Sequence, residues 1–410
     1  MRQWSRNKLP ALAKDNYRRF ALGQIVSLNG TWMSHIAESW LVYELTRSTL
    51  AVGLVRFLHT IPVTFLSFYG GALADRLSKR RILLSTQSVS MALALTLFLL
   101  AATEILEVWM VGVIALLLGT AHAFDIPARQ SFLVEMVGKD ALMNAITINS
   151  TIFNSARMLG PAMAAVVVEQ WGAAYCFLIN GISFGAALCA YATIRTTEKP
   201  PTVDRPKDQG RFETWRFVAK RPALRRTIAL VTVASFFATP YMALAPAFVD
   251  RELAGTGGAF ARLMAANGVG AFAGAATLIV TGSRFRKEHL VGAGALGLAI
   301  SLLVFSSSRS LWAASTAIAT GGWFMILFFS SANTLTQLST PDGMRGRVMG
   351  LYSFCFIGIS PFGTLSMSGL ASALSVSTAL TVGACALLTA ALWVVVGFSR
   401  DHRKSQVTTP

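Results

Sequence analysis

Charged residues are scarce in this chain. Only 13% of its 410 residues are Asp, Glu, Lys or Arg, against roughly 25% in a typical soluble domain. Hydrophobic residues make up 54%. This balance argues against a soluble enzyme, a disordered protein and a fibrous protein. It indicates a polytopic helical membrane protein.

Acidic residues are the rarer charges, with 19 Asp and Glu against 36 Lys and Arg. In a soluble protein such an excess would suggest a nucleic-acid partner. Here the basic residues fall in short blocks between apolar runs, which is typical of cytoplasmic loops facing anionic lipid. We therefore expect a lipid bilayer as a partner, and no nucleic acid.

Motifs for enzyme chemistry are also missing. The four cysteines lie inside apolar runs, with no C-x-x-C pattern and no histidine at metal-site spacing. No phosphate-binding G-x-x-x-x-G-K-[ST] occurs, and the glycine-rich run at 268–274 lies in an apolar helix without a partner strand. We expect no enzyme activity, no cofactor and no metal site.

Twelve stretches reach the length of about 20 residues that a membrane-spanning helix needs. The predicted fold is all-α, with twelve transmembrane helices in two six-helix bundles. The predicted domains are a first bundle at 1–195, a cytoplasmic linker with a short interfacial helix at 196–226, and a second bundle with its tail at 227–410. The predicted spans are 20–44, 50–74, 82–102, 108–128, 142–168, 173–194, 227–249, 258–281, 289–308, 312–338, 348–372 and 376–398.

The distribution of positive charge predicts the orientation. With both termini in the cytoplasm, 30 of the 36 Lys and Arg residues fall on the cytoplasmic side, three fall outside and three lie within spans. Cytoplasmic loops carry such an excess of positive charge. The N-terminal segment lacks a cleavable-signal pattern, so the first helix is expected to stay.

The segment between the second and third predicted helices has the sequence GALADRLSKRR at 71–81. It resembles the major facilitator signature G-x-x-x-D-R-x-G-R-R, with Ser78 in place of the second glycine. Four further segments resemble the bacterial exporters that include the enterobactin exporter: GQIVS at 23–27, WLVYELT at 40–46, FDIPARQ at 124–130 and RGRVMG at 345–350. The resemblance implies proton-driven export of a siderophore, a drug or another small amphiphile.

The resemblance also implies a conformational latch at the cytoplasmic face. Its residues are Gly71, Asp75, Arg76, Arg80 and Arg129. Glycine permits close helix packing, and the Asp75 carboxylate could meet Arg129 or the helix N-terminus expected at Thr340-Pro341.

Gly160 and Pro161 resemble the exporter motif of the fifth helix, G-x-x-x-G-P-x-x-G-G. Alanines at 156, 164 and 165 replace three of its glycines. An ordinary proline kink is the alternative interpretation.

Ionisable residues inside the spans are the candidates for proton coupling. At 1.5 Å per helical residue, Glu38 lies about 27 Å and His35 about 22 Å from the cytoplasmic end of the first helix, and Arg157 climbs about 22 Å along the fifth. Burial favours the neutral form of a carboxyl group and a nearby arginine favours its charged form. We expect Glu38 to bind the proton, with His35 sharing it and Arg157 modulating it.

Asp125 is the rival site for the proton. It stands four residues before Arg129, where a local ion pair is the simpler interpretation. For His35, Glu38 and Arg56, snorkelling to the interface is the alternative.

Aromatic and small polar residues replace buried charges in the second half. Phe236, Tyr241, Trp323, Asn333 and Tyr352 are the candidates for the substrate cavity, which would suit a bulky, partly apolar molecule. Ordinary core or lipid-facing positions are the alternative.

Together these patterns predict a monomeric, multi-pass transporter of the bacterial cytoplasmic (inner) membrane that exports a small molecule against protons. An uptake symporter and a non-transporting sensor or scaffold of the same fold are the alternatives.

Overall fold

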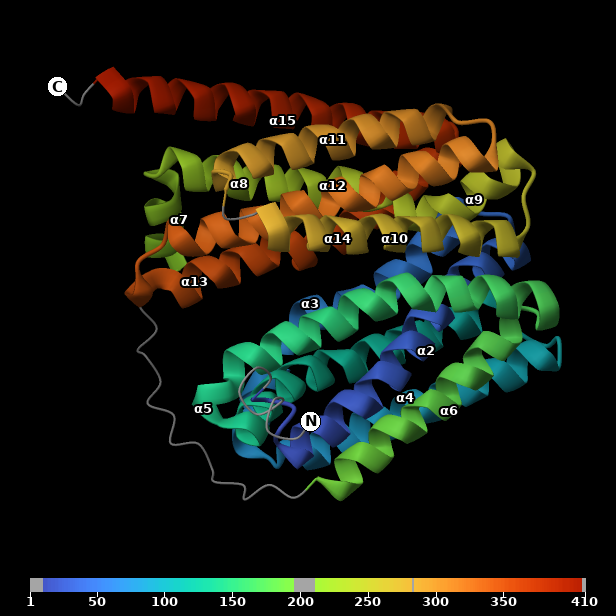
Figure 1. Ribbon diagram of the computed structural model, residues 1–410. Helices are drawn as coiled ribbons and strands as arrows, with labels where there is room; N and C mark the ends of the chain where they lie inside the picture. Colours follow the sequence, from blue (N-terminus) through green and yellow to red (C-terminus); the bar gives the residue numbers. More distant parts are fainter. Residues whose placement is uncertain (1–9, 195–210, 282–283, 408–410) are drawn as a thin grey trace. The chain divides into compact units, whose positions relative to one another are not determined.

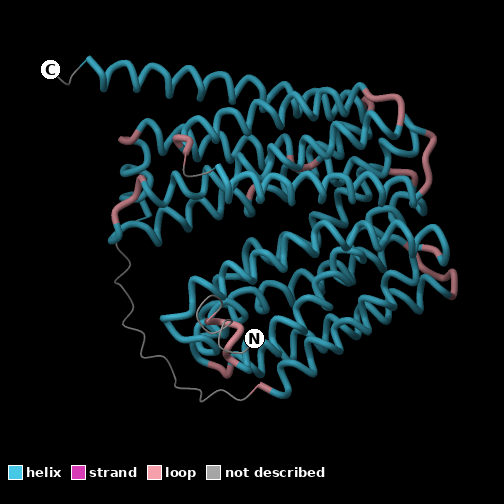
Figure 2. Tube along the Cα trace, in the orientation of Figure 1, coloured by secondary structure: helices cyan, strands magenta, loops and turns pink. Residues whose placement is uncertain are grey.

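The computed structural model describes all residues except 1–9, 195–210, 282–283 and 408–410. Within this described part every regular element is a helix and no strand occurs (Figures 1 and 2). The elements are α2 (Asp15–Thr46), α3 (Thr49–Arg76), α4 (Lys79–Ala102), α5 (Val108–Trp171), α6 (Ala173–Thr193), α7 (Arg211–Ala219), α8 (Pro222–Val233), η1 (Ala234–Ala238), α9 (Tyr241–Leu253), α10 (Gly257–Thr281), α11 (Lys287–Ser307), α12 (Leu311–Leu338), α13 (Asp342–Ser353), η2 (Phe354–Gly358), α14 (Ser360–Ala373) and α15 (Val376–Val407).

Eleven helical stretches of the described chain are long and apolar enough to cross a membrane. The helix α2, with 32 residues, is long enough to add a twelfth. Polar side chains along it, among them Gln24, Asn29, His35 and Glu38, lower its mean hydropathy. The predicted all-α, polytopic fold is confirmed.

The helix α5 corrects one predicted loop. It runs for 64 residues, and a single residue, Gly138, departs from helical geometry with φ 72° and ψ 175°. The region 129–141, expected as a loop, is therefore helical on both sides of Gly138. A positive φ is accessible to glycine because it has no Cβ, so two successive spans are joined by one residue.

Close packing between α2 and α5 occurs at Gly160. A Cβ there would press on the backbone of Asn29 and the side chain of Trp32. Pro161 follows inside the helix. Gly160 therefore stands where α2 and α5 approach each other closely.

Compact packing divides the chain into two units. The first comprises Met1–Arg47, Leu54–Asp204 and Gly257–Ala265. In it α2 packs against α5 and α6, and α4 packs against the same two helices. Aromatic residues fill its core, where the Tyr191 ring lies 6.1 Å from Phe20 and 6.2 Å from Phe132.

The second unit comprises Ser48–Gly53, Arg205–Thr256 and Ala266–Pro410. Its α11 packs against α12 and α15. Two of its spans contain a π-helical turn: Thr239 N–H donates to the Ala234 carbonyl at 2.9 Å, and Ile359 N–H to the Phe354 carbonyl at 3.1 Å. Each turn lies just before a proline, Pro240 or Pro361, whose missing N–H prevents a regular α-helical bond.

The short helix α7 occupies the second half of the predicted linker. Trp215 on it is 55% exposed, and Val218 packs into a small core with Leu224 and Ile228 of α8. The predicted short helix is thus present. Its position at the membrane surface stays a prediction, and residues 195–210 of the linker lie outside the described part.

Gly70 and Gly71 form a matched pair for testing helix contact. A Cβ at Gly70 would press on the Ala123 carbonyl oxygen of α5, whereas one at Gly71 would meet no described atom within 4 Å. At this end of α3 the close approach to α5 therefore lies one residue before the glycine expected from the signature. Gly70→Ala should destabilise the protein by about 1–3 kcal/mol, and Gly71→Ala should be neutral or stabilise it by up to about 1 kcal/mol. Thermal unfolding of the two purified variants in detergent checks this, and equal shifts would contradict it.

Candidate functional site in the first unit

Asp125 is a fully buried carboxylate on α5, with its side chain 1% exposed. It accepts hydrogen bonds from the Thr86 hydroxyl at 3.0 Å and the Gln87 amide at 2.9 Å, both on α4. Arg129, one turn further along α5, forms an ion pair with it. The predicted local ion pair is confirmed. Such bonds satisfy a charge that burial would otherwise make costly.

Arg129 connects this pair to two more helices. Its guanidinium donates to the Gln24 side-chain oxygen on α2 at 2.7 Å, and the Gln24 amide donates to the Tyr191 hydroxyl on α6 at 3.1 Å. The network therefore joins α2, α4, α5 and α6. Asp125 and Arg129 do not stand at a helix end as expected, because α5 continues to Gly138. Sequence reasoning missed Gln24, Thr86 and Gln87.

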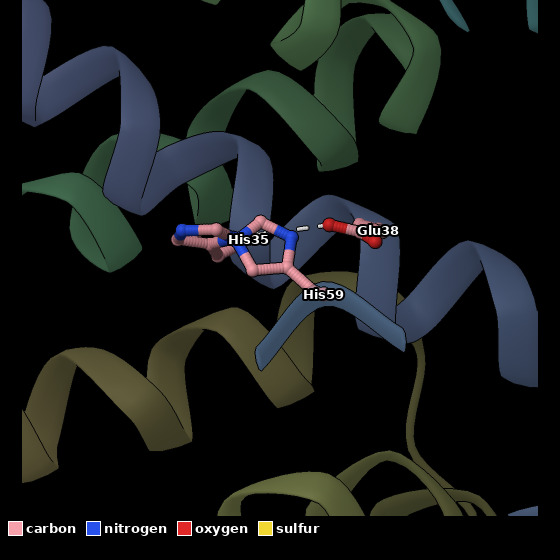
Figure 3. Close-up of side chains that lie close together, drawn as sticks. All are labelled: His35, Glu38 and His59. Atoms are coloured by element: carbon pink, nitrogen blue, oxygen red, sulfur yellow. Dashed lines mark ion pairs between the residues drawn. The ribbon is translucent and has the colours of Figure 1, made fainter. Parts of the chain in front are cut away.

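His35, Glu38 and His59 form a second group (Figure 3). His35 Nδ1 lies 3.8 Å from Glu38 Oε2, so these two share a face of α2 as predicted. The ring of His59, on α3, lies 5.0 Å from the ring of His35. Glu38 is 5% exposed and His59 is 8% exposed, so the group is shielded from solvent within the protein.

A fourth titratable residue, His122 on α5, completes this region. Its ring centroid is 5.2 Å from that of His59. All four side chains line a small cavity of about 20 Å³. The sequence interpretation missed His122, although an ionisable residue inside an apolar span and one turn before Asp125 was a usable signal.

Arg157 lies over the Trp32 ring, 5.9 Å from its centroid, and Trp32 in turn packs edge-on against His35. Arg56 on α3 is close enough to Glu38 to interact with it electrostatically. The structure thus places Arg157 next to Trp32, the ring that packs against His35.

Two residues of the signature loop stabilise helix ends. Arg80 donates to the carbonyls of Tyr191 at 2.8 Å and Ala192 at 2.5 Å, at the C-terminal end of α6, where a positive charge is favourable. Ser78 accepts a bond from the Arg81 N–H and caps α4.

Arg76 and Asp75 are two further residues of the expected latch. Arg76 is exposed, and the side chain of Asp75 lies outside the described part of the chain. The expected helix N-terminus shifts by one residue, since α13 begins at Asp342 with Pro341 as its N-cap residue. The Thr340 hydroxyl is bonded to the Thr336 carbonyl instead. The latch stays a prediction.

The aromatic candidates lie in the second unit. Tyr352 is buried and donates to the Phe329 carbonyl at 3.1 Å, and Phe329 packs 4.7 Å from Phe356. The Asn333 oxygen accepts from Gln337. The Trp323 indole donates to Thr277 on α10 at 3.0 Å.

The remaining two candidates occupy neighbouring turns. Phe236 lies in η1, with its ring centroid 4.8 Å from that of Phe237, and Tyr241 is 3% exposed at the start of α9. The substrate cavity stays a prediction.

Comparisons with known proteins identify the family and the fold of this chain. The family model described as transmembrane secretion effector, a major facilitator family, matches residues 7–406. The multidrug efflux pump Tap of Mycolicibacterium fortuitum is 24% identical over 84% of this chain and 86% of its own length. The enterobactin exporter EntS of Salmonella typhimurium is 22% identical over 95% of this chain and 94% of its own.

The staphyloferrin A transporter of Staphylococcus aureus is 29% identical over 43% of this chain, and the match spans only 45% of that transporter. Among solved structures, the nucleoside transporter NupG gives a TM-score of 0.73 at 11% identity, covering 94% of this chain and 99% of that one. The peptide transporter POT gives 0.74 at 12% identity, covering 98% of both chains. At these identities the solved structures show the fold alone.

The Asp125–Arg129 pair should behave as a coupled unit. Asp125→Asn and Arg129→Gln should each lower the free energy of unfolding by about 3–5 kcal/mol, because each leaves a buried charge without its partner. The double variant should lose less than the sum of the two. Denaturant unfolding in detergent and a double-mutant cycle measure this. The exposed Asp15–Arg18 pair on α2 is the matched control, with an expected coupling below about 1 kcal/mol. Additive losses at Asp125 and Arg129 would contradict the expectation.

Proposed function

Because the chain belongs to the transmembrane secretion effector family of the major facilitator superfamily, we propose that it exports a small amphiphilic molecule, siderophore-like or drug-like, by alternating access. The observation that carries this proposal is the match to a drug efflux pump and to a siderophore exporter over 84% and 95% of the chain. The fold alone would fit import equally well, since transporters of this architecture move many substrates.

We propose that protons drive the export and that Asp125 is the coupling carboxylate. Its partner Arg129 also binds Gln24 on α2, so a shift of α2 along α5 would change how strongly the arginine holds Asp125. A carboxylate whose counter-ion moves between two conformations gains and loses a proton with the conformational change. This is the physical requirement for coupling.

Glu38 is the alternative coupling carboxylate, with His35 beside it and Arg157 one aromatic ring away. The sequence favours Glu38 over Asp125. The arrangement around Asp125 supports Asp125 over Glu38, because Arg129, its ion-pair partner, also binds Gln24. The transport assay below separates the two.

The remaining expectations complete the proposal. We place the substrate against the aromatic residues of the second unit, among them Phe236, Trp323 and Tyr352. The signature residues Asp75 and Arg76 would act as a cytoplasmic latch, with both termini on the cytoplasmic side of the inner membrane of a bacterium and the protein working as a monomer.

A strain lacking the protein should secrete less siderophore or become more susceptible to a drug, and this profile identifies a substrate. In proteoliposomes, wild-type protein should then accumulate that substrate only when a pH gradient is imposed. Asp125→Asn should lose gradient-driven accumulation and keep downhill exchange, because the mutated site can no longer exchange a proton. Glu38→Gln should keep both activities.

Three outcomes would contradict parts of this proposal. Loss of coupling in Glu38→Gln alone would assign the proton to Glu38. Substrate movement down the proton gradient, together with the proton, would make the protein an uptake symporter. The absence of any flux for substrates found in the strain profile would favour a sensor or scaffold.

A further inference from the structure

The histidine and glutamate group on α2 and α3 has the composition of a metal site. One ring nitrogen of His35, one ring nitrogen of His59 and one carboxylate oxygen of Glu38 lie within 4.8 Å of one another. Figure 3 shows the two rings and the carboxylate close together, contributed by two helices. We propose that His35, Glu38 and His59 bind one divalent transition-metal ion of the zinc class.

The distances suit a single ion. Zinc binds histidine nitrogen and carboxylate oxygen at about 2.0–2.2 Å in tetrahedral geometry, so two of its ligand atoms are about 3.3–3.6 Å apart. His35 Nδ1 and Glu38 Oε2, at 3.8 Å, are already close to this separation. The longest separation is at most 4.8 Å, so it must shorten by about 1.2–1.5 Å to reach tetrahedral geometry, which rotation of the His59 and Glu38 side chains can supply.

The surrounding space also has the size of an ion. These side chains line a cavity of about 20 Å³, which is close to the volume needed for one water molecule. Thr31, Ser34 and Asn180 line it as well, and their polar groups can orient the ligands or hold a water on the ion.

His59 supplies an independent reason to expect an occupant. It is 8% exposed, and its Nδ1 atom is buried with no hydrogen-bond partner in the part of the chain that the structure describes. A buried polar atom without a partner is costly, and a bound metal ion would satisfy it. The His122 ring packs against His59 from α5 and holds a further imidazole beside the site.

The ligand chemistry selects the class of metal. Imidazole nitrogen suits zinc, copper, iron and nickel, whereas calcium and magnesium prefer shells built from oxygen alone. Two imidazoles and one carboxylate therefore favour a transition metal. A bound ion would join α2 to α3 inside the first unit.

Arg56 opposes the ion and provides a sharp control. It lies on α3 within electrostatic range of both Glu38 and His59. A positive charge this close repels a divalent cation, and in the protein interior such repulsion is weakly screened. A metal ion bound at Glu38 therefore competes with the electrostatic attraction between Glu38 and Arg56.

Zinc titration of the full-length protein in detergent, purified with a histidine-free affinity tag, tests the site. We expect one tight Zn²⁺ per chain. His59→Asn and Glu38→Gln should each weaken Zn²⁺ binding at least about tenfold. Mutating a residue that only hydrogen-bonds to a metal ligand already lowers metal affinity roughly 10–100-fold. His289→Asn, at an exposed histidine of α11, should leave binding unchanged.

Two measurements remain informative if a ligand variant fails to fold. Arg56→Gln should tighten binding by about tenfold or more, a gain that misfolding cannot produce. Co²⁺ added to wild-type protein should give the visible absorption bands of a low-coordinate site with nitrogen ligands. Absence of stoichiometric Zn²⁺ binding to wild-type protein, unchanged affinity in both His59→Asn and Glu38→Gln, or a Co²⁺ spectrum of the hydrated ion would each overturn the proposal.

Discussion

Burying an ionised carboxylate away from water is the constraint on which the first unit depends. Asp125 is held by groups from two helices, and its arginine partner reaches a third. Removing such a charge from water is repaid only when its bonding positions are filled with good geometry. The packing of α2, α4, α5 and α6 is therefore fixed at this point by polar contacts as well as by the aromatic core beside it.

The two units carry different chemistry. Buried titratable groups concentrate in the first unit, around Asp125 and around the His35, Glu38 and His59 group. The second unit contributes packed aromatic rings, such as Phe329 against Phe356, and the buried Tyr352 hydroxyl, which donates to the Phe329 carbonyl.

The sequence predicted the features that are local to one helix. His35 with Glu38 and Asp125 with Arg129 were visible because residues three or four positions apart share a helix face. The contacts of His59 and His122 were hidden, since they arise only when separate helices pack. The loop expected after Arg129 was wrong for a related reason. Polar residues there suggested a loop, although Phe132, Met136 and Val137 form a buried helical face.

The π-helical turns at η1 and η2 have a consequence for the faces of two spans. A π turn holds more residues than an α turn, so it changes the angular register of everything that follows it. Side chains of α9 and α14 therefore point in directions that a helical wheel drawn straight through Ala234–Ala238 or Phe354–Gly358 would assign to other residues. Deleting one residue within either turn would restore α-helical spacing and leave the residues that follow on nearly the same faces, because the π turn takes up its extra residue within the turn itself.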